Sequence, residues 1–187
     1  MAEDRAGNES IVDLLYADDA QIQTLFERLA AAENNRSPAA SVSRLIARIC
    51  ESLSIQRLAE EEVLYPAIRA SDDKLVFAFL LADLGISMCI GEIRDPAKPR
   101  TARDFSVQRL KELVRRNLTE RGQILFPFVR SRLSQTQMTW LGDDYQQRKS
   151  RLWAIANSRH EPRQAVRKTA ANPLWRRRTE RDETRAR

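Results

Sequence analysis

The sequence has one histidine, His160, among its 187 residues. A single imidazole cannot build the multi-histidine centres that hold iron or catalytic zinc in many proteins. It also lies near the C-terminus, beyond the apolar segments, where it cannot serve as the base of a Ser-His-Asp or Cys-His arrangement. The sequence therefore excludes a histidine-ligated metal centre and histidine-dependent nucleophilic catalysis.

Cysteine, glycine and proline are scarce as well: the chain has two, five and seven of them. Cys50 and Cys89 are 39 positions apart and form no C-x-x-C metal motif. We expect two separate buried, reduced thiols, with a redox-sensing pair as the alternative. The small number of glycines and prolines leaves room for long helices.

No stretch approaches the roughly 18–20 apolar residues that a membrane-spanning helix needs. The first ten residues are polar and partly acidic, without the apolar segment of a secretory signal. These two features predict a cytoplasmic protein.

The net charge of +6 is unevenly distributed along the chain. Residues 156–187 hold ten Lys or Arg against four Asp or Glu, so this stretch carries the whole excess and residues 1–155 are neutral. Its prolines and arginines predict a disordered basic tail. A contact with nucleic acid or with an anionic membrane is the functional alternative, and its candidate residues are Trp175, Arg176, Arg177 and Arg178.

The hydrophobic pattern has a helical period throughout, and no hairpin signal interrupts it. We predict long helices over about 10–32, 38–66, 72–94 and 102–133, then a shorter fifth helix after Ser134. Short connections favour antiparallel neighbours, so the predicted fold is an all-α, up-down-up-down four-helix bundle. Residues 10–155 form this bundle, residues 1–9 a flexible N-terminus and residues 156–187 the tail.

Local signals set the expected helix ends. Ser10 with Asp13, and Ser134 with Gln137, are candidate capping boxes. Ser37 is a candidate cap before a helix that opens with proline. Pro66 should kink or end the second helix, and Pro127 should kink the last turns of the fourth.

Each of the four long predicted helices carries polar residues near the middle of its apolar stripe. Since the midpoints of helices in an up-down bundle lie at similar heights, these side chains should converge in one buried layer. The six predicted members are Asp18, Gln56, Glu60, Asp83, Asn117 and Arg121.

Three segments contain residues of this layer within a distinctive order and spacing of residues. Residues 14–19 read Leu-Leu-Tyr-Ala-Asp-Asp, residues 56–66 read Gln-Arg-Leu-Ala-Glu-Glu-Glu-Val-Leu-Tyr-Pro, and residues 117–127 run from Asn-Leu-Thr-Glu-Arg to Leu-Phe-Pro. They resemble hemerythrin-like, HHE cation-binding domains, and the resemblance covers about residues 10–155. It implies a four-helix bundle that holds non-haem iron and serves oxygen binding or redox and iron sensing.

The same resemblance shows what this chain lacks. The histidines of the family fall on Asp18 or Asp19, on Gln56, on Asp83 and on Asn117, and Arg121 stands where the family has a second acid. Only Glu60 keeps a ligand type. We therefore expect no iron and no other cofactor, with Arg121 pairing the carboxylates while Gln56 and Asn117 complete the network. The alternative is one hard cation on Asp18, Glu60 and Asp83.

Three functions follow as hypotheses. The first is a non-enzymatic binding or regulatory protein that has lost di-iron binding and acts on a protein or other partner through its surface or tail. The second is a metal-binding hemerythrin-like protein of oxygen, iron or redox response. The third is a nucleic-acid accessory protein that binds through residues 156–187, with an affinity that falls steeply with salt.

Overall fold

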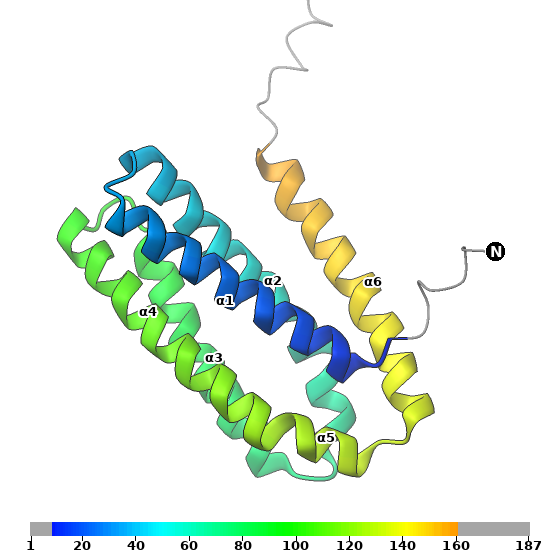
Figure 1. Ribbon diagram of the computed structural model, residues 1–187. Helices are drawn as coiled ribbons and strands as arrows, with labels where there is room; N and C mark the ends of the chain where they lie inside the picture. Colours follow the sequence, from blue (N-terminus) through cyan, green and yellow to red (C-terminus); the bar gives the residue numbers. More distant parts are fainter. Residues whose placement is uncertain (1–8, 161–187) are drawn as a thin grey trace, which may run out of the picture. The chain divides into compact units, whose positions relative to one another are not determined.

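The computed structural model describes residues 9–160, and all regular structure within this range is helical (Figure 1). The elements in chain order are α1 (Ile11–Asn34), α2 (Ala39–Arg69), α3 (Asp73–Arg94), α4 (Arg100–Glu120), the π-helix η1 (Arg121–Leu125), α5 (Phe126–Arg132) and α6 (Gln135–His160). The predicted all-α class is confirmed.

The chain forms two compact units, Met1–Trp153 and Ala154–Arg187. The first unit holds α1 to α5 and most of α6. The described part of the second is the end of α6, which continues past residue 155, where the tail was expected to begin. Trp175 and Arg176 to Arg178 lie outside the described residues.

The last helix is longer than predicted. With 26 residues, α6 is not a short fifth helix but one of the longest elements of the described chain. The physical reason is that its sequence has no glycine after Gly142 and no proline before Pro162, so nothing in it interrupts the ladder of backbone hydrogen bonds.

Two of the predicted caps are present. The Ser10 hydroxyl accepts a hydrogen bond from the backbone N–H of Asp13 at 3.3 Å and caps α1. Before α6, the Gln137 side chain accepts from the backbone N–H of Ser134 at 2.9 Å. The predicted cap at Ser37 is wrong: α2 begins at Ala39 with Pro38 in the cap position and no side-chain cap bond.

The two internal prolines are accommodated differently. Pro66 lies inside α2, which continues to Arg69, so it does not end that helix. Pro127 lies in the first turn of α5, directly after η1. Pro127 has no N–H to donate to the ladder of backbone hydrogen bonds, and the widened turn of η1 lies directly before it. Such π-segments are frequent at functional sites. The fourth predicted helix is therefore three elements, α4, η1 and α5.

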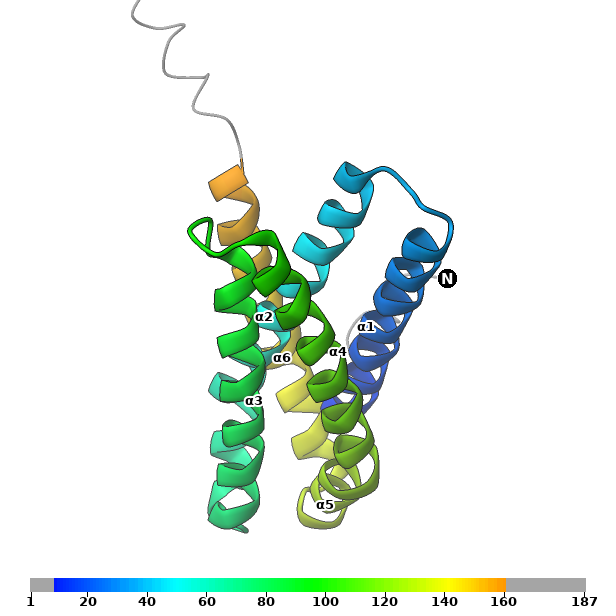
Figure 2. The same cartoon turned by 90° about the vertical axis from the view of Figure 1, so that its left-hand side faces the viewer.

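Consecutive helices pack against each other: α1 against α2, α2 against α3, and α3 against α4 (Figures 1 and 2). Their buried apolar side chains form two clusters. The first contains Leu15, Leu64, Phe79, Leu125 and Tyr145 among others, and the second contains Ile22, Leu53, Ile86, Leu110 and Val114 among others. Asp19 of α1, Gln56 of α2 and Asp83 of α3 each lie, along their helices, between a member of one cluster and a member of the other.

The start of α6 packs closely on the start of α1. A Cβ added to Gly142 would lie 2.4 Å from the backbone oxygen of Glu9 and 3.2 Å from the backbone nitrogen of Ile11. Any side chain at this position would force the two segments apart. Farther along, α6 also contacts α2: the ring of Trp153 lies under the guanidinium of Arg48, 4.2 Å from its central carbon.

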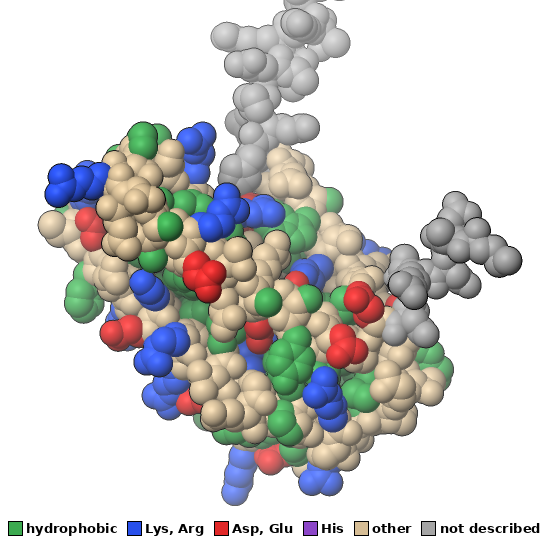
Figure 3. Space-filling model, viewed as in Figure 1, with side chains coloured by type: hydrophobic (Ala, Val, Ile, Leu, Met, Phe, Trp, Pro, Cys, Tyr) green, Lys and Arg blue, Asp and Glu red, His purple; other side chains and the backbone are tan. Residues whose placement is uncertain are grey.

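One sequence expectation about α3 requires correction. The sequence pattern predicts no segment apolar enough to cross a membrane. By length and composition, however, α3 is long and apolar enough to do so. Buried core helices of soluble proteins meet the same criterion, but only 33% of the most apolar window of α3 is buried. Figure 3 shows a different face, over α1 and α4, where acidic and basic side chains are mixed and apolar ones are scattered.

Candidate functional site

Arg121 is the centre of a buried polar layer between the two apolar clusters. Its side chain is 3% exposed, although it begins the π-helix η1. Its Nε donates a hydrogen bond to Oδ2 of Asp19 at 3.0 Å, and its Nη1 donates to Oε2 of Glu60. The ring of Phe126 lies 5.2 Å from the guanidinium carbon. One cation thus joins the carboxylates of α1 and α2.

Asp19 has partners on both of its carboxylate oxygens. Besides Arg121 on Oδ2, the amide of Gln56 donates from Nε2 to Oδ1 at 2.7 Å. Because a buried carboxylate is costly unless its oxygens are satisfied, this pairing explains how an aspartate is tolerated in the core. Gln56 is itself buried, on the same face of α2 as Glu60 one turn later.

Asp83 in α3 belongs to the layer through a different partner. The Tyr65 hydroxyl donates to Oδ2 of Asp83 at 2.9 Å, and both residues are buried. Sequence reasoning counted neither Tyr65 nor its hydroxyl as part of the layer. The available signal was its position five residues after Glu60, since a buried tyrosine hydroxyl needs a polar partner.

Three polar atoms of the layer have no protein partner among the described residues: Oε1 of Glu60, Nδ2 of Asn117 and Nη2 of Arg121. All three side chains line a cavity of about 20 Å³. A cavity of this size holds about one water molecule, and such a water needs two to four polar partners. The layer therefore has room for one bridging water and for nothing much larger.

Burial and like charge raise the pKa values of the layer's acids. Burial raises the pKa of Glu60 to about 7 and that of Asp83 to about 6, against the opposing effects of Arg121 on Glu60 and of the Tyr65 hydrogen bond on Asp83. Burial also raises the pKa of Asp19, although Arg121 and Gln56 act in the opposite direction. Because Asp19 and Glu60 share one guanidinium and the hydrogen-bond partner of Asp83 is a neutral hydroxyl, the layer takes up a proton more readily than separate acids in water would.

Arg121 keeps its positive charge while the neighbouring acids titrate. Burial acts to lower its pKa, but the neighbouring carboxylates of Glu60 and Asp19 outweigh this effect and hold the pKa well above its ordinary value. The layer consequently contains a permanent cation at its centre.

Asp18, predicted as the first member of the layer, is not part of it; Asp19 takes that place. Both positions fit the helical stripe, because Leu15 and Ile22 are compatible with a core residue at either spacing. Asp18 instead faces α6, where it accepts a hydrogen bond from the Tyr145 hydroxyl at 2.7 Å and another from the Lys149 ammonium. Alignment with the hemerythrin-like motif favoured Asp19 for this position, whereas the helical period of the apolar stripe favoured Asp18.

The donor set does not suit an iron centre. The layer offers carboxylate and amide oxygens but no imidazole, and the guanidinium of Arg121 occupies the space between the carboxylates of Asp19 and Glu60. Over residues 9–160, no three His, Cys, Asp or Glu side chains lie close enough together to hold a metal ion. The predicted trio for a hard cation, Asp18, Glu60 and Asp83, is not brought together, since Asp18 faces away.

Cys50 and Cys89 are both buried and unpaired in the second apolar cluster. Burial raises the pKa of the Cys50 thiol to about 11 and also raises that of Cys89. Because the thiolate is the reactive form, both are held in an unreactive state. This geometry favours two core cysteines over a redox-sensing pair.

Comparison of the chain with protein-family models, with curated proteins and with solved structures finds no match.

Proposed function

We propose that this protein is a hemerythrin-like, up-down-up-down four-helix bundle that has lost its iron site and acts as a non-enzymatic binding or regulatory protein. Support for the family comes from the wording and spacing of residues 14–19, 56–66 and 117–127. These segments supply Asp19, Gln56, Glu60, Asn117 and Arg121, all of which are buried at one level between two apolar clusters.

One observation carries the proposal: Arg121 binds Asp19 and Glu60 at the same time. In a metal centre, the cation would neutralise the inward carboxylates and orient them. Here a guanidinium supplies that positive charge from within the chain, with a planar fork that suits carboxylates. The bundle then needs no metal to offset its buried acids.

The size of the layer supports a non-enzymatic role. Its cavity of about 20 Å³ has no room for a substrate, and four of the six carboxylate oxygens of Asp19, Glu60 and Asp83 already accept hydrogen bonds from the protein. The layer thus acts as a structural element that fixes how the helices pair. Function then falls to the outside of the bundle.

The test is the metal content of purified full-length protein, expressed with iron, manganese and zinc supplied and measured by elemental mass spectrometry. We expect less than about a tenth of an equivalent of any of these metals, in the wild type and in Glu60→Gln alike. Near-stoichiometric metal that disappears in Glu60→Gln would overturn the proposal and favour a metal-dependent oxygen, iron or redox response.

A further inference from the structure

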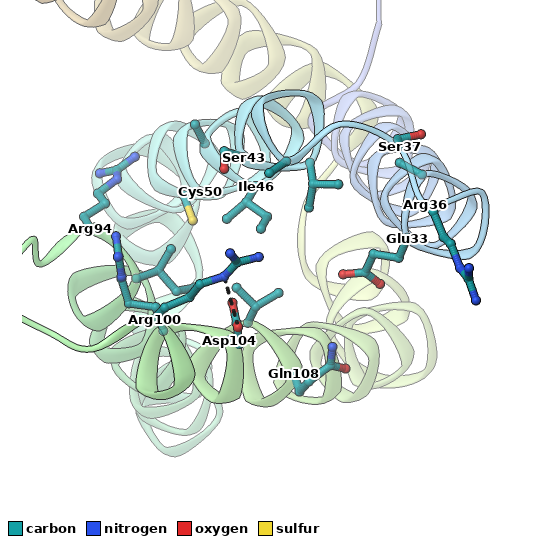
Figure 4. A pocket seen from close by; sticks show the side chains of 17 residues that line it. Glu33, Arg36, Ser37, Ser43, Ile46, Cys50, Arg94, Arg100, Asp104 and Gln108 are labelled. Atoms are coloured by element: carbon teal, nitrogen blue, oxygen red, sulfur yellow. Dashed lines mark ion pairs between the residues drawn. The ribbon is translucent and has the colours of Figure 1, made fainter.

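A second cavity lies in the first unit, far larger than the one at the polar layer. It has a volume of about 750 Å³ and is bounded by the end of α1, the start of α2, the end of α3 and the start of α4 (Figure 4). This volume falls in the range of small-molecule binding sites. The cavity shares no lining residue with the polar layer.

The inner wall of this cavity is apolar. It is formed by Val42, Ile46 and Cys50 of α2, by Ile93 of α3 and by Val107 of α4. In Figure 4 the side chains of Ile46 and Cys50 point into the space between the helices. Such a wall favours a hydrocarbon chain or an aromatic ring over water.

The mouth of the cavity is cationic. Four arginines, Arg36, Arg94, Arg100 and Arg103, are among the residues that line the cavity, together with two acids, Glu33 and Asp104, which leaves an excess of two positive charges. In Figure 4 the side chain of Arg36 points away from the space. The Arg100–Asp104 pair, at 3.8 Å, is exposed to solvent.

Arg94 and Arg103 are the available cations. No carboxylate within residues 9–160 makes an ion pair with either, and Nε of Arg103 is buried without an acceptor in that range. A buried guanidinium nitrogen that donates to nothing is costly, and an anionic oxygen from a ligand would satisfy it.

Arg36 adds backbone strain at the same mouth. Its φ of 51° makes it the one non-glycine residue with a left-handed backbone over residues 9–160. It occupies the position after the C-cap of α1, where glycine is usual, and the N–H of Ser37 reaches back to the carbonyl of Ala32 at 2.9 Å.

We propose that this cavity binds an amphipathic anion, whose apolar chain or ring packs against Val42, Ile46 and Val107 while its carboxylate or phosphate is bound by Arg94 and Arg103. The proposal gives a ligand class to the binding role proposed above. It uses none of the residues of the polar layer, so the two proposals can fail separately.

Isothermal titration calorimetry on the full chain tests the ligand class with three probes. Decanoate has both the chain and the charge, decanol has the chain alone and acetate has the charge alone. We expect decanoate to bind at least about tenfold more tightly than decanol, and acetate not to bind measurably. Equal affinity for decanoate and decanol would overturn the cationic half of the proposal, and no binding of either would overturn the whole.

Variants locate the site. The double variant Arg94→Gln/Arg103→Gln should weaken decanoate binding at least about tenfold and leave decanol unchanged. The control Arg28→Gln/Arg115→Gln removes the same charge from exposed positions of α1 and α4 outside the cavity and should bind like the wild type. An equal loss in both double variants would reduce the effect to net charge and contradict the site.

One single change keeps the test independent of charge. Ala47→Trp fills the cavity from its exposed wall and should abolish binding of decanoate and decanol together. Unchanged binding in Ala47→Trp would contradict the assignment.

A separate observation concerns the outer face of α3. Phe77, Leu81, Leu84 and Met88 are 64%, 58%, 54% and 57% exposed and follow each other at spacings of four, three and four residues. Between residues 75 and 91 the only charged residue of α3 is Asp83, which is buried. We call these four residues the α3 stripe.

The α3 stripe is symmetric about its own midpoint. Phe77 and Met88 lie equally far from the midpoint of the stripe, and so do Leu81 and Leu84. An antiparallel copy would therefore place Phe77 against Met88 and Leu81 against Leu84. A two-fold axis requires this self-complementarity, and the four-three-four spacing is that of a helix-pairing seam. The uncharged face presents no like charges to its copy.

From this symmetry we infer that two copies of the chain pair through the α3 stripe. Each stripe exposes on the order of 400 Å² of apolar surface, a size typical of interaction patches. Two copies would bury on the order of 800 Å² there, less than the standard interface of about 1,600 Å², so the dimer should be weak and concentration-dependent.

Sedimentation velocity over a range of micromolar concentrations tests this inference. We expect a reversible monomer–dimer equilibrium that Leu81→Glu abolishes. The matched control is Trp140→Glu, which alters an equally exposed apolar residue of α6 and should dimerise like the wild type. A monomer at all concentrations would contradict the inference. So would a monomer that binds anionic phospholipid vesicles through the α3 stripe.

Discussion

Arg121 and Asp19 are 102 positions apart in the sequence, yet Nε of Arg121 donates a hydrogen bond to Oδ2 of Asp19 at 3.0 Å inside the core. This contact joins α1 to the segment that follows α4. Together with the bond from Arg121 to Glu60, it makes three helical segments depend on one side chain. Its energetic consequences can be measured.

Arg121→Glu should lower the free energy of unfolding by about 3–5 kcal/mol, because it leaves the carboxylates of Asp19 and Glu60 buried without a cation. Urea denaturation monitored by circular dichroism measures this loss. The control Arg116→Glu breaks an exposed pair with Glu120 and should cost no more than about 1 kcal/mol. Equal midpoints for Arg121→Glu and the wild type would contradict the buried role of Arg121.

Stability should depend on pH through Glu60 and Asp83. Their folded pKa values, about 7 and about 6, exceed the values of an unfolded chain, so the native state binds more protons between about pH 4 and pH 7. Their contribution to the unfolding free energy is therefore full below about pH 4 and is lost as the pH rises to about 7. Urea midpoints of Glu60→Gln at pH 4.5 to 7.5 should fall less steeply than those of the wild type. Parallel curves would contradict the shift.

Tyr65→Phe should destabilise the fold by about 1–3 kcal/mol. The substitution keeps the ring but removes the hydroxyl that donates to Asp83, and it leaves a buried carboxylate oxygen unsatisfied. Thermal and urea unfolding measure the loss. The double variant Tyr65→Phe/Asp83→Asn should lose less than the two single variants added together, since the pair acts as a unit. Strict additivity would show that the hydrogen bond contributes nothing.

Two glycine-to-alanine changes should have opposite effects. Gly142→Ala should cost about 1–3 kcal/mol, because its Cβ would clash with the backbone at the start of α1. Gly122→Ala has no atom within 4 Å of the new Cβ outside its own helix and should be neutral or stabilising by up to about 1 kcal/mol. Differential scanning calorimetry of the two variants, compared with the wild type, tests the close packing of α6 on α1. A stabilising Gly142→Ala would contradict it.

Sequence periodicity located most of the polar layer. Gln56, Glu60, Asp83 and Asn117 interrupt apolar stripes at helical spacing, and all four are buried as predicted. The helical period does not distinguish Asp18 from Asp19. Adjacent residues on a helix are about 100° apart, and the flanking apolar residues allow either one to face inward.

Other features depend on contacts that no single segment contains. The role of Tyr65 depends on Asp83 of another helix, and that of Tyr145 on Asp18. The π-helix at Arg121 has no periodic signature, although Gly122 and Pro127 mark the region as unusual. The large cavity depends on how four helix ends diverge, and this spacing is set by packing rather than by local sequence.

The central claim is that the guanidinium of Arg121 offsets the buried carboxylates, so that the fold requires no metal. The most direct test is the thermal midpoint of the full chain with a chelator, compared with the midpoint in the presence of Fe²⁺, Mn²⁺ or Zn²⁺. A ligand that binds the native state raises the midpoint by mass action, so a bound metal would reveal itself even when its affinity is modest. The account predicts equal midpoints under all four conditions. A midpoint that rises with one of the metals, and no longer does so in Glu60→Gln, would contradict it.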